Sequence, residues 1–320
     1  MEAIETSARR VVLLGPQRER ETLREVVDEL GLEGPLATVT AGWEEREAED
    51  AELAAHLGGR TRNLGLYPRA EEVFREDRPV RDLLNERFDR LRQLQTLYRM
   101  RLGPLLETAR TLLSEQGPHY GSEVHGEHVE SAIAMIRTLD AEHLDHAARL
   151  DAEIAERIGA ERRGVLQRHQ DELAEVLSDV GGLLIAGGHV GILLNRLRLF
   201  GVLELCPDAP IVAWSGGAMV LTDRIVLFHD SPPQGPGDAE IYAPGLGLLS
   251  GIVPLPHAKR RLRLDDPARV ALFTRRFAPA ECVALDAGCR VDRTADGGWR
   301  VPTGTHCLTV DGSLIEGAVA

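Results

Sequence analysis

A serine at the end of an apolar run has the surroundings that acyl-transfer chemistry needs. The run Pro210-Ile-Val-Ala-Trp214 ends at Ser215, and the small residues Gly216-Gly-Ala218 follow. We expect a strand that turns sharply into a helix, which pushes the serine hydroxyl out of the backbone and beside free N–H groups. An exposed nucleophile next to such donors suits acyl transfer, because the donors stabilise the oxyanion that forms. A tight strand–helix junction without chemistry uses the same residue types and is the alternative.

A histidine farther along the chain suits the role of general base for this serine. His257 follows the apolar run Ile252-Val-Pro-Leu-Pro256, which has the composition of a strand. Sites in open α/β sheets gather at the carboxyl ends of strands. We therefore expect Ser215 and His257 to end neighbouring strands of one sheet, with their side chains adjacent. A histidine in that position accepts the serine proton; an ordinary loop histidine is the alternative.

An acid between these two residues would complete a triad by orienting the imidazole. Asp230 ends the strand-like run Arg224-Ile-Val-Leu-Phe-His-Asp230, so it is the first choice. Asp238 and Glu240 fall in the same interval, just after the Pro- and Gly-rich stretch 231–237, where positions are less defined. The sequence therefore leaves three candidate acids, and a solvated turn residue is the alternative for Asp230.

Six stretches between residues 181 and 312 share the pattern of one known family. They are Leu183-Leu-Ile-Ala-Gly-Gly188, Ser215-Gly-Gly-Ala218, Gly245-Leu-Gly-Leu-Leu249, Pro256-His257, Cys282-Val-Ala-Leu-Asp-Ala-Gly288 and Leu308-Thr-Val-Asp-Gly312. This pattern resembles the dipeptidase E and cyanophycinase group of serine peptidases, within the wider class I glutamine amidotransferase-like fold.

The resemblance implies a three-layer α/β fold with a mostly parallel sheet, and a serine hydrolase that cleaves an amide or peptide bond of a small peptide. By similarity, Ser215 is the nucleophile and His257 the base. The backbone N–H groups of Gly188 and Gly216 form the oxyanion hole. No metal or organic cofactor is implied.

Two positions depart from the family pattern, and they bear on substrate and activity. Gly216 stands where relatives usually have alanine, and His189 where they have Asn, Asp or Gln, so the inherited specificity is open. We list His189, Arg261 and Arg263 as substrate-binding candidates, because relatives favour acidic or aspartyl-linked peptides and an arginine supplies the counter-charge. A basic surface run, Lys259-Arg-Arg-Leu-Arg263, is the alternative for the two arginines.

These two departures also support a second hypothesis from another class of protein. The chain would then be a catalytically inactive amidotransferase-like scaffold that acts as a binding or assembly module through its helical arm.

Composition agrees with an α/β enzyme and excludes several other classes. The chain has 320 residues, 43% hydrophobic and 28% charged, and a formal net charge of −14. Such an acidic chain is a poor partner for nucleic acid or an anionic membrane. We recognise neither a signal peptide nor an apolar run of the roughly 20 residues that span a membrane, and expect a cytoplasmic protein. The widely spaced cysteines indicate reduced, partly buried thiols: Cys206, Cys282, Cys289 and Cys307.

Hydrophobic patterning divides the chain into two parts of one α/β domain and an insertion. Residues 1–79 form the first part, with strands expected at 11–14, 36–40 and 63–67 and helices at 19–30 and 44–57. Residues 181–320 form the second part and carry the Ser/His site. Apolar strands that alternate with helices indicate a parallel sheet covered on both faces.

Residues 80–180 between these parts have the pattern of long helices. In the first helix apolar residues recur at 3–4 spacing, interrupted by Gln95, through Leu84, Phe88, Leu91, Tyr98, Leu102, Leu105, Ala109 and Leu112. Two more helical runs follow, the last from about 161 to 180. We expect an arm that stands apart from the sheet and forms a homodimer.

Histidines on the arm raise the question of a metal site. His143 and His146 share a helix face, with Asp140 and Glu142 nearby. A solvated polar face is favoured over a metal centre, because no Glu-x-x-His repeat occurs in a partner helix.

Overall fold

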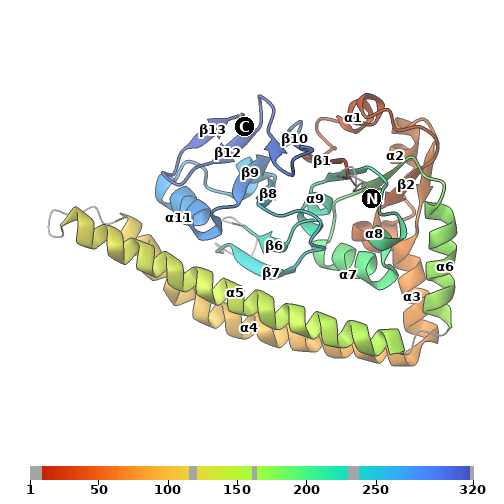
Figure 1. Cartoon of the computed structure of the whole chain (residues 1–320), viewed down its shortest axis with the longest axis horizontal. Coiled ribbons are helices and arrows are strands. Elements are labelled where there is room, and N and C mark those ends of the chain that lie inside the picture. The colour runs from red at the N-terminus through yellow and green to blue at the C-terminus, as the bar shows by residue number, and fades with distance from the viewer. Residues whose placement is uncertain (1–8, 115–120, 161–163, 230–237, 318–320) are drawn as a thin grey trace, which may run out of the picture.

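The core of the protein is a seven-stranded, mostly parallel sheet (Figure 1). The computed structural model describes residues 9–114, 121–160, 164–229 and 238–317. The strand order is β11-β10-β1-β5-β4-β2-β3. Five strands run parallel, namely β1 (Val11–Leu14), β5 (Ile211–Trp214), β4 (Gly182–Ile185), β2 (Leu36–Val39) and β3 (Thr61–Asn63). Antiparallel strands β10 (Arg290–Arg293) and β11 (Trp299–Arg300) form one edge.

Alternate residues of the central strands pack into apolar clusters on the two faces of the sheet. This arrangement confirms the expected α/β fold. Val12 and Leu14 face a cluster shared with α1 (Leu23–Glu29). Val11 and Leu13 face the larger core on the other side of the sheet. That side is covered by α3 (Leu66–Glu76), α6 (Val165–Leu177), α7 (Val190–Phe200) and α8 (Val202–Leu205). All residues of β1, β2, β4 and β5 are buried, as a doubly covered parallel sheet requires.

The strand before His257 does not join this sheet, which corrects the expectation of neighbouring strands. It lies in a separate four-stranded sheet of order β13-β12-β9-β8. The members are β8 (Ile252–Pro256), β9 (Glu281–Leu285), β12 (His306–Leu308) and β13 (Leu314–Glu316). A two-stranded hairpin, β6 (Arg224–Leu227) and β7 (Glu240–Pro244), is antiparallel. Short helices α9 (Gly216–Val220) and α10 (Ala258–Arg261) and the longer α11 (Pro267–Phe277) complete this half.

The predicted insertion is a long helical hairpin, but it does not stand apart from the rest. It consists of α4 (Arg78–Ser114) and α5 (Ser122–Ala160), and α6 follows it back to the sheet. Figure 1 shows the hairpin running along the whole molecule, beneath α7, β7 and α11. Its inner face joins the main core, through residues that include Tyr98, Leu102, Leu106, Ile133 and Ile136.

A buried polar network fixes the hairpin to the C-terminal half. The Tyr98 hydroxyl of α4 donates to Asp140 of α5 at 2.7 Å. Arg276 of α11, with its side chain only 1% exposed, donates to both Asp140 oxygens at 2.7 and 2.8 Å and to Tyr98 at 2.7 Å. Gln95, the polar interruption of the expected stripe, is also buried and donates to the carbonyl of Ile241 in β7. The interruption is therefore a docking contact.

Several local predictions fail because of contacts between residues far apart in sequence. The expected strand at 63–67 ends at Asn63, since Glu47 accepts the N–H groups of Leu66 and Tyr67 at 3.1 and 2.6 Å and so starts α3. Burial raises the pKa of this carboxyl to about 7. The expected helix at 44–57 is two pieces, a 3₁₀ segment Ala41–Arg46 (η1), itself interrupted at Glu44 with a φ of 61°, and α2 (Ala51–His56).

In the first half of α4 the predicted apolar stripe is displaced by one residue. Phe88 is 56% exposed, whereas its neighbour Arg87 is buried. The Arg87 side chain binds Asp151 at 2.7 Å and Asn195 at 2.8 Å. A paired arginine therefore occupies the place that periodicity assigns to phenylalanine.

Candidate functional site

Ser215 occupies the sharp strand-to-helix turn that the sequence predicts. It follows β5 directly and precedes α9. Its backbone has φ 51° and ψ −122°, a conformation that is costly for a residue with a side chain. The N–H of Ser215 donates to the carbonyl of Leu14 in the neighbouring β1 at 3.1 Å, which fixes the turn to the sheet. Strained conformations of this kind cluster at active sites.

Gly187, the first of two glycines after β4, approaches the serine so closely that a side chain would not fit there. A Cβ atom on Gly187 would lie 2.6 Å from the Cβ of Ser215 and 3.0 Å from the nitrogen of Gly216. A Cβ atom on Gly216 would lie 3.5 Å from the nitrogen of Gly188. The two predicted oxyanion-hole glycines are therefore neighbours beside the serine. Neither of their N–H groups has an acceptor within the described part of the chain.

The loop after β2 supports Gly188 from behind, a role that the sequence did not suggest. The N–H of His189 donates to the carbonyl of Gly42 at 2.7 Å, and the backbone of Gly42 packs on Gly188. This contact is made with backbone atoms only. In the sequence, therefore, Gly42 itself is the one residue that could have indicated it.

His257 follows β8 in a left-handed conformation, with φ 58°. It is half-buried, and its N–H donates to the carbonyl of Leu285 in β9 at 3.4 Å. Burial lowers the pKa of the imidazole, and the Arg261 guanidinium lowers it further; the Asp286 carboxylate acts in the opposite direction. A lowered pKa keeps the ring neutral near pH 7, which a general base requires.

Gly15, just after β1, connects the serine and the histidine across the two sheets. Its N–H donates to the carbonyl of Cys289 at 2.9 Å, and a Cβ atom here would overlap the carbonyl oxygen of Asp286. Leu14, the preceding residue, accepts the N–H of Ser215, so the serine turn and the segment after β9 contact adjacent residues of the chain. Between the side chains of Ser215 and His257, the structure of the described residues shows no hydrogen bond. Such bonds often tighten only when substrate binds.

Of the three acids proposed for the triad, two are paired with arginines of the hairpin and the third stays a prediction. Asp230 lies outside the described residues. Asp238 pairs with Arg110. Glu240 binds Arg99 through both carboxylate oxygens. Both arginines belong to α4, so these two acids are engaged by the hairpin.

Asp286, a residue not among the predicted acids, is the carboxylate whose charge acts most strongly on His257. It follows β9, the parallel neighbour of β8, and accepts the N–H of Lys259 at 3.1 Å. Its electrostatic effect raises the pKa of His257. The signal was present in the sequence, because the run Cys282-Val-Ala-Leu-Asp286 is another apolar strand that ends in an acid.

The three substrate-binding candidates are in different environments. Arg261 is half-buried and burial lowers its pKa; its charge acts on both His257 and His229, and no carboxylate pairs with it in the described part of the chain. Arg263 is 3.5 Å from Asp266 and lines a pocket next to α11. His189 caps α7, with its Nδ1 accepting the N–H of Ile192 at 3.2 Å.

The histidines of the hairpin do not form a metal site with the residues that the structure describes. No group of three or more His, Cys, Asp and Glu side chains in this part of the chain is arranged to hold a metal ion. His143 is instead buried and stacked on Tyr98, with ring centroids 4.2 Å apart. All four cysteines are buried and free. In the described segments, each helix is too short or too polar to cross a membrane.

The comparisons with known proteins include a distant structural match that spans nearly the whole chain. No protein-family model matches the sequence, and no curated protein does. The structure is similar to the crystal structure of a peptidase from an acI-B1 Actinobacterium, with a TM-score of 0.46 and 13% sequence identity over 97% of each chain. That similarity is too distant to transfer chemistry. Function must therefore be argued from the residues around Ser215.

Proposed function

We propose that this chain is a serine hydrolase that cleaves an amide or peptide bond of a small peptide, of the dipeptidase E and cyanophycinase type. The observation that carries the proposal is the turn at Ser215. There a strained serine lies against two glycines, Gly188 and Gly216, whose N–H groups have no acceptor among the described residues. Strain and unused donors at one point are costly in a purely structural junction, and an oxyanion site gives both a use.

The mechanism follows the usual acyl-transfer sequence. The Ser215 hydroxyl oxygen attacks the carbonyl carbon of the scissile bond while His257 takes the hydroxyl proton. The carbonyl π electrons move to oxygen, and the N–H groups of Gly188 and Gly216 stabilise that charge. When the tetrahedral intermediate collapses, the C–N bond breaks and the amine leaves with the proton from His257. Water then gives a proton to His257 and attacks the acyl carbon; the C–O bond to Ser215 breaks, and His257 returns the proton to the serine oxygen.

Asp286 takes the place of the acid in this proposal. Its charge favours the protonated imidazole that forms during attack, which is what the acid of a triad contributes. The sequence-based candidates Asp238 and Glu240 are already paired with arginines of α4.

Arg261 is the residue we propose for recognition of a substrate carboxylate. It is a half-buried cation beside the base, and no acid in the described chain neutralises it. A carboxylate-bearing peptide would supply the missing counter-charge, and a guanidinium binds a carboxylate with two parallel hydrogen bonds.

A fluorophosphonate probe tests the proposal without knowledge of the substrate. We expect stoichiometric labelling of the native protein and none of Ser215→Ala, while Ser122→Ala, an exposed serine on the hairpin, labels normally. Asp286→Asn should slow labelling by roughly 10²–10⁴, since loss of a triad acid leaves the base unoriented. Equal labelling of Ser215→Ala would overturn the proposal.

One observation favours the scaffold as a second candidate function: the absence of a Ser215–His257 hydrogen bond in the described residues. In that case the hairpin would act by self-association, and its exposed apolar residues Leu97 and Met100 on α4 are the proposed contact. Light scattering of the double variant Leu97→Gln/Met100→Gln tests this. A folded native protein that resists the probe, but changes from dimer to monomer in the variant, supports the scaffold.

A further inference from the structure

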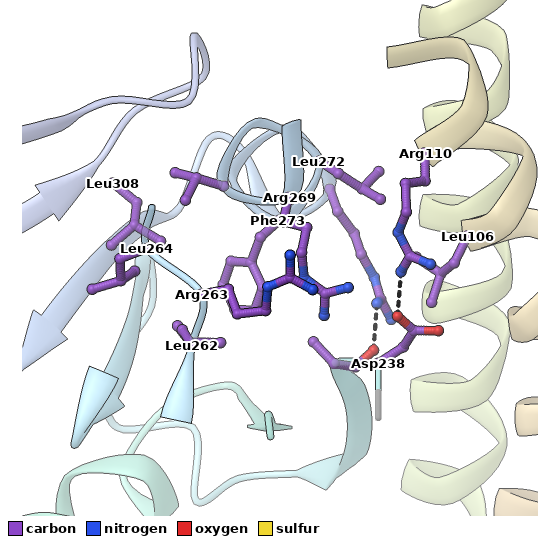
Figure 2. Close-up of a pocket in the computed structure, with 13 residues that line it drawn as sticks. Leu106, Arg110, Asp238, Leu262, Arg263, Leu264, Arg269, Leu272, Phe273 and Leu308 are labelled. Carbon is purple, nitrogen blue, oxygen red and sulfur yellow. Dashed lines mark hydrogen bonds and ion pairs between the residues drawn. The ribbon is translucent and has the colours of Figure 1, made fainter. Parts of the chain in front are cut away.

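A pocket separate from the Ser215 site opens between α4, α11 and the segment that follows α10 (Figure 2). It encloses about 520 Å³ of empty space, its open mouth included. Its walls are mostly apolar and comprise Leu106, Leu262, Leu264, Val270, Leu272, Phe273 and Leu308. None of the residues that surround Ser215 lines it. The apolar character of these walls suits a small molecule with an apolar body.

The polar lining of this pocket is rich in arginine, although the protein as a whole is acidic. The described lining holds four arginines, Arg110, Arg263, Arg269 and Arg276, and one carboxylate, Asp238. Three of these arginines pair with carboxylates: Arg110 with Asp238, Arg263 with Asp266 and Arg276 with Asp140. Figure 2 shows the side chains of Arg263 and Arg269 extending together into the pocket, while Arg110 enters from α4 on the opposite side. Three elements thus direct positive charge to one place. The net charge of −14 makes such a concentration unexpected from composition alone.

Two of these arginines, Arg276 and Arg110, differ in how many of their donors have a hydrogen-bond acceptor. The guanidinium of Arg276 is satisfied by Asp140, Tyr98 and the carbonyl of Ala239, so it belongs to the rigid floor. Arg110 pairs with Asp238, but its Nε is buried and lacks an acceptor in the described residues. A buried donor without an acceptor is costly. A ligand that brings an acceptor to this wall removes that cost.

We propose that this pocket binds a carboxylate that carries an apolar body, such as an N-acylated leucine or phenylalanine. The arginines present the donor geometry that recognises a carboxylate through paired hydrogen bonds. The leucine and phenylalanine side chains around them bury the apolar part. The carboxylate of the ligand therefore faces the arginines, and its apolar body contacts the leucine and phenylalanine side chains. The proposal does not depend on hydrolysis at Ser215.

A binding experiment with three related probes separates the two contributions. N-acetyl-L-leucine is titrated into the full-length protein labelled with ¹³C at leucine methyl groups, and the chemical shifts are followed by NMR. N-acetyl-L-leucinamide lacks the carboxylate, and N-acetylglycine lacks the apolar side chain. We expect N-acetyl-L-leucine to shift the methyl signals of Leu264 and Leu272 and to bind at least about tenfold more tightly than either analogue, as loss of a charge-assisted hydrogen bond predicts.

Two variants locate the binding within the pocket. Arg110→Gln removes the unsatisfied donor and should weaken N-acetyl-L-leucine about tenfold, while Arg92→Gln, an exposed arginine on the same helix, should leave it unchanged. Leu264→Trp fills the apolar side without a change of charge and should also abolish binding. Equal binding of the amide, or unchanged binding by both pocket variants, overturns the proposal. So does loss of binding in protein whose Ser215 is blocked by the fluorophosphonate, because the probe would then occupy the Ser215 site.

Discussion

Two of the regions that join the C-terminal half of the chain to the rest differ in the kind of contact. One is made by backbone atoms and the other by side chains. At the Ser215 site the contact is between backbones, as where Gly15 lies against the carbonyl of Asp286. At the hairpin the contact is between side chains, where Arg276 binds Tyr98 and Asp140 in a buried network. The close backbone contact leaves no room for an added side-chain atom. The buried network is destabilised when one of its charges is removed. Substitutions in the two regions should therefore fail for opposite reasons.

The largest expected effect is loss of the buried cation of the hairpin network. Arg276→Met leaves the buried Asp140 carboxylate without its cation and with only the Tyr98 hydroxyl as a donor, which should lower the free energy of unfolding by about 3–5 kcal/mol. The matched control is Arg101→Met, whose partner Glu142 is exposed, so that its cost should stay below about 1 kcal/mol. Urea denaturation measures both. Similar costs for the two variants would mean that the buried network does not hold the hairpin.

The second-largest expected effect is the loss of stability when a methyl group is added at the backbone contact. Gly15→Ala forces the Asp286 carbonyl to move and should cost about 1–3 kcal/mol or more, with loss of activity because the acid is displaced. Gly103→Ala in α4 meets nothing within 4 Å and should instead stabilise the helix by up to about 1 kcal/mol. Thermal unfolding of both variants is the measurement. If Gly15→Ala is as harmless as its control, the two halves of the site are not in close contact.

Relief of backbone strain at the nucleophile is a smaller effect. Ser215→Gly removes the hydroxyl and abolishes activity, yet it should raise the free energy of unfolding by on the order of 1 kcal/mol, because glycine adopts this φ and ψ without strain. Ser215→Ala keeps the strain and should show no comparable gain. A Ser215→Gly protein no more stable than Ser215→Ala would indicate that the turn is not strained.

The smallest effect is a displacement of the pH profile. His257 must be neutral to act as a base, so activity is lost as the pH falls through its pKa. The Arg261 guanidinium contributes to lowering that pKa. In Arg261→Gln the pKa should rise, and the acid limb of kcat/KM should move to higher pH. Arg92→Gln, far along α4, is the control; an unmoved limb in Arg261→Gln would place that arginine away from the base.

The fold was largely predictable because most of its elements are defined by local patterns. The apolar runs at Val11, Leu36 and Gly182 and the long 3–4 spacing of α4 each identify an element without reference to the rest of the chain. The errors occur where a side chain from a distant part of the sequence determines where an element begins or ends. Glu47 starts α3 from outside that helix, and no periodicity near Leu66 records it.

The candidate site was predictable at its glycines and serine but not in its assembly. Short motifs with unusual backbone requirements, such as Ser215-Gly216 and Gly187-Gly188, are visible in sequence because few other residues satisfy them. The expectation that β5 and β8 are neighbours was wrong, because a motif does not specify which sheet its strand joins. Asp286, the acid we propose, follows His257 in the sequence, whereas the predicted acids all lie between Ser215 and His257.

The order of elements along the chain determines when the hairpin network can form during synthesis. Asp140 and Tyr98 leave the ribosome well before Arg276, the residue that neutralises and holds them. Strand β1 likewise emerges first but pairs with β5 and β10, the second of which follows Arg276. The nascent chain thus carries two long helices with uncovered apolar faces until most of the protein has been made. Chaperones that bind exposed apolar helices should therefore meet this protein at that stage.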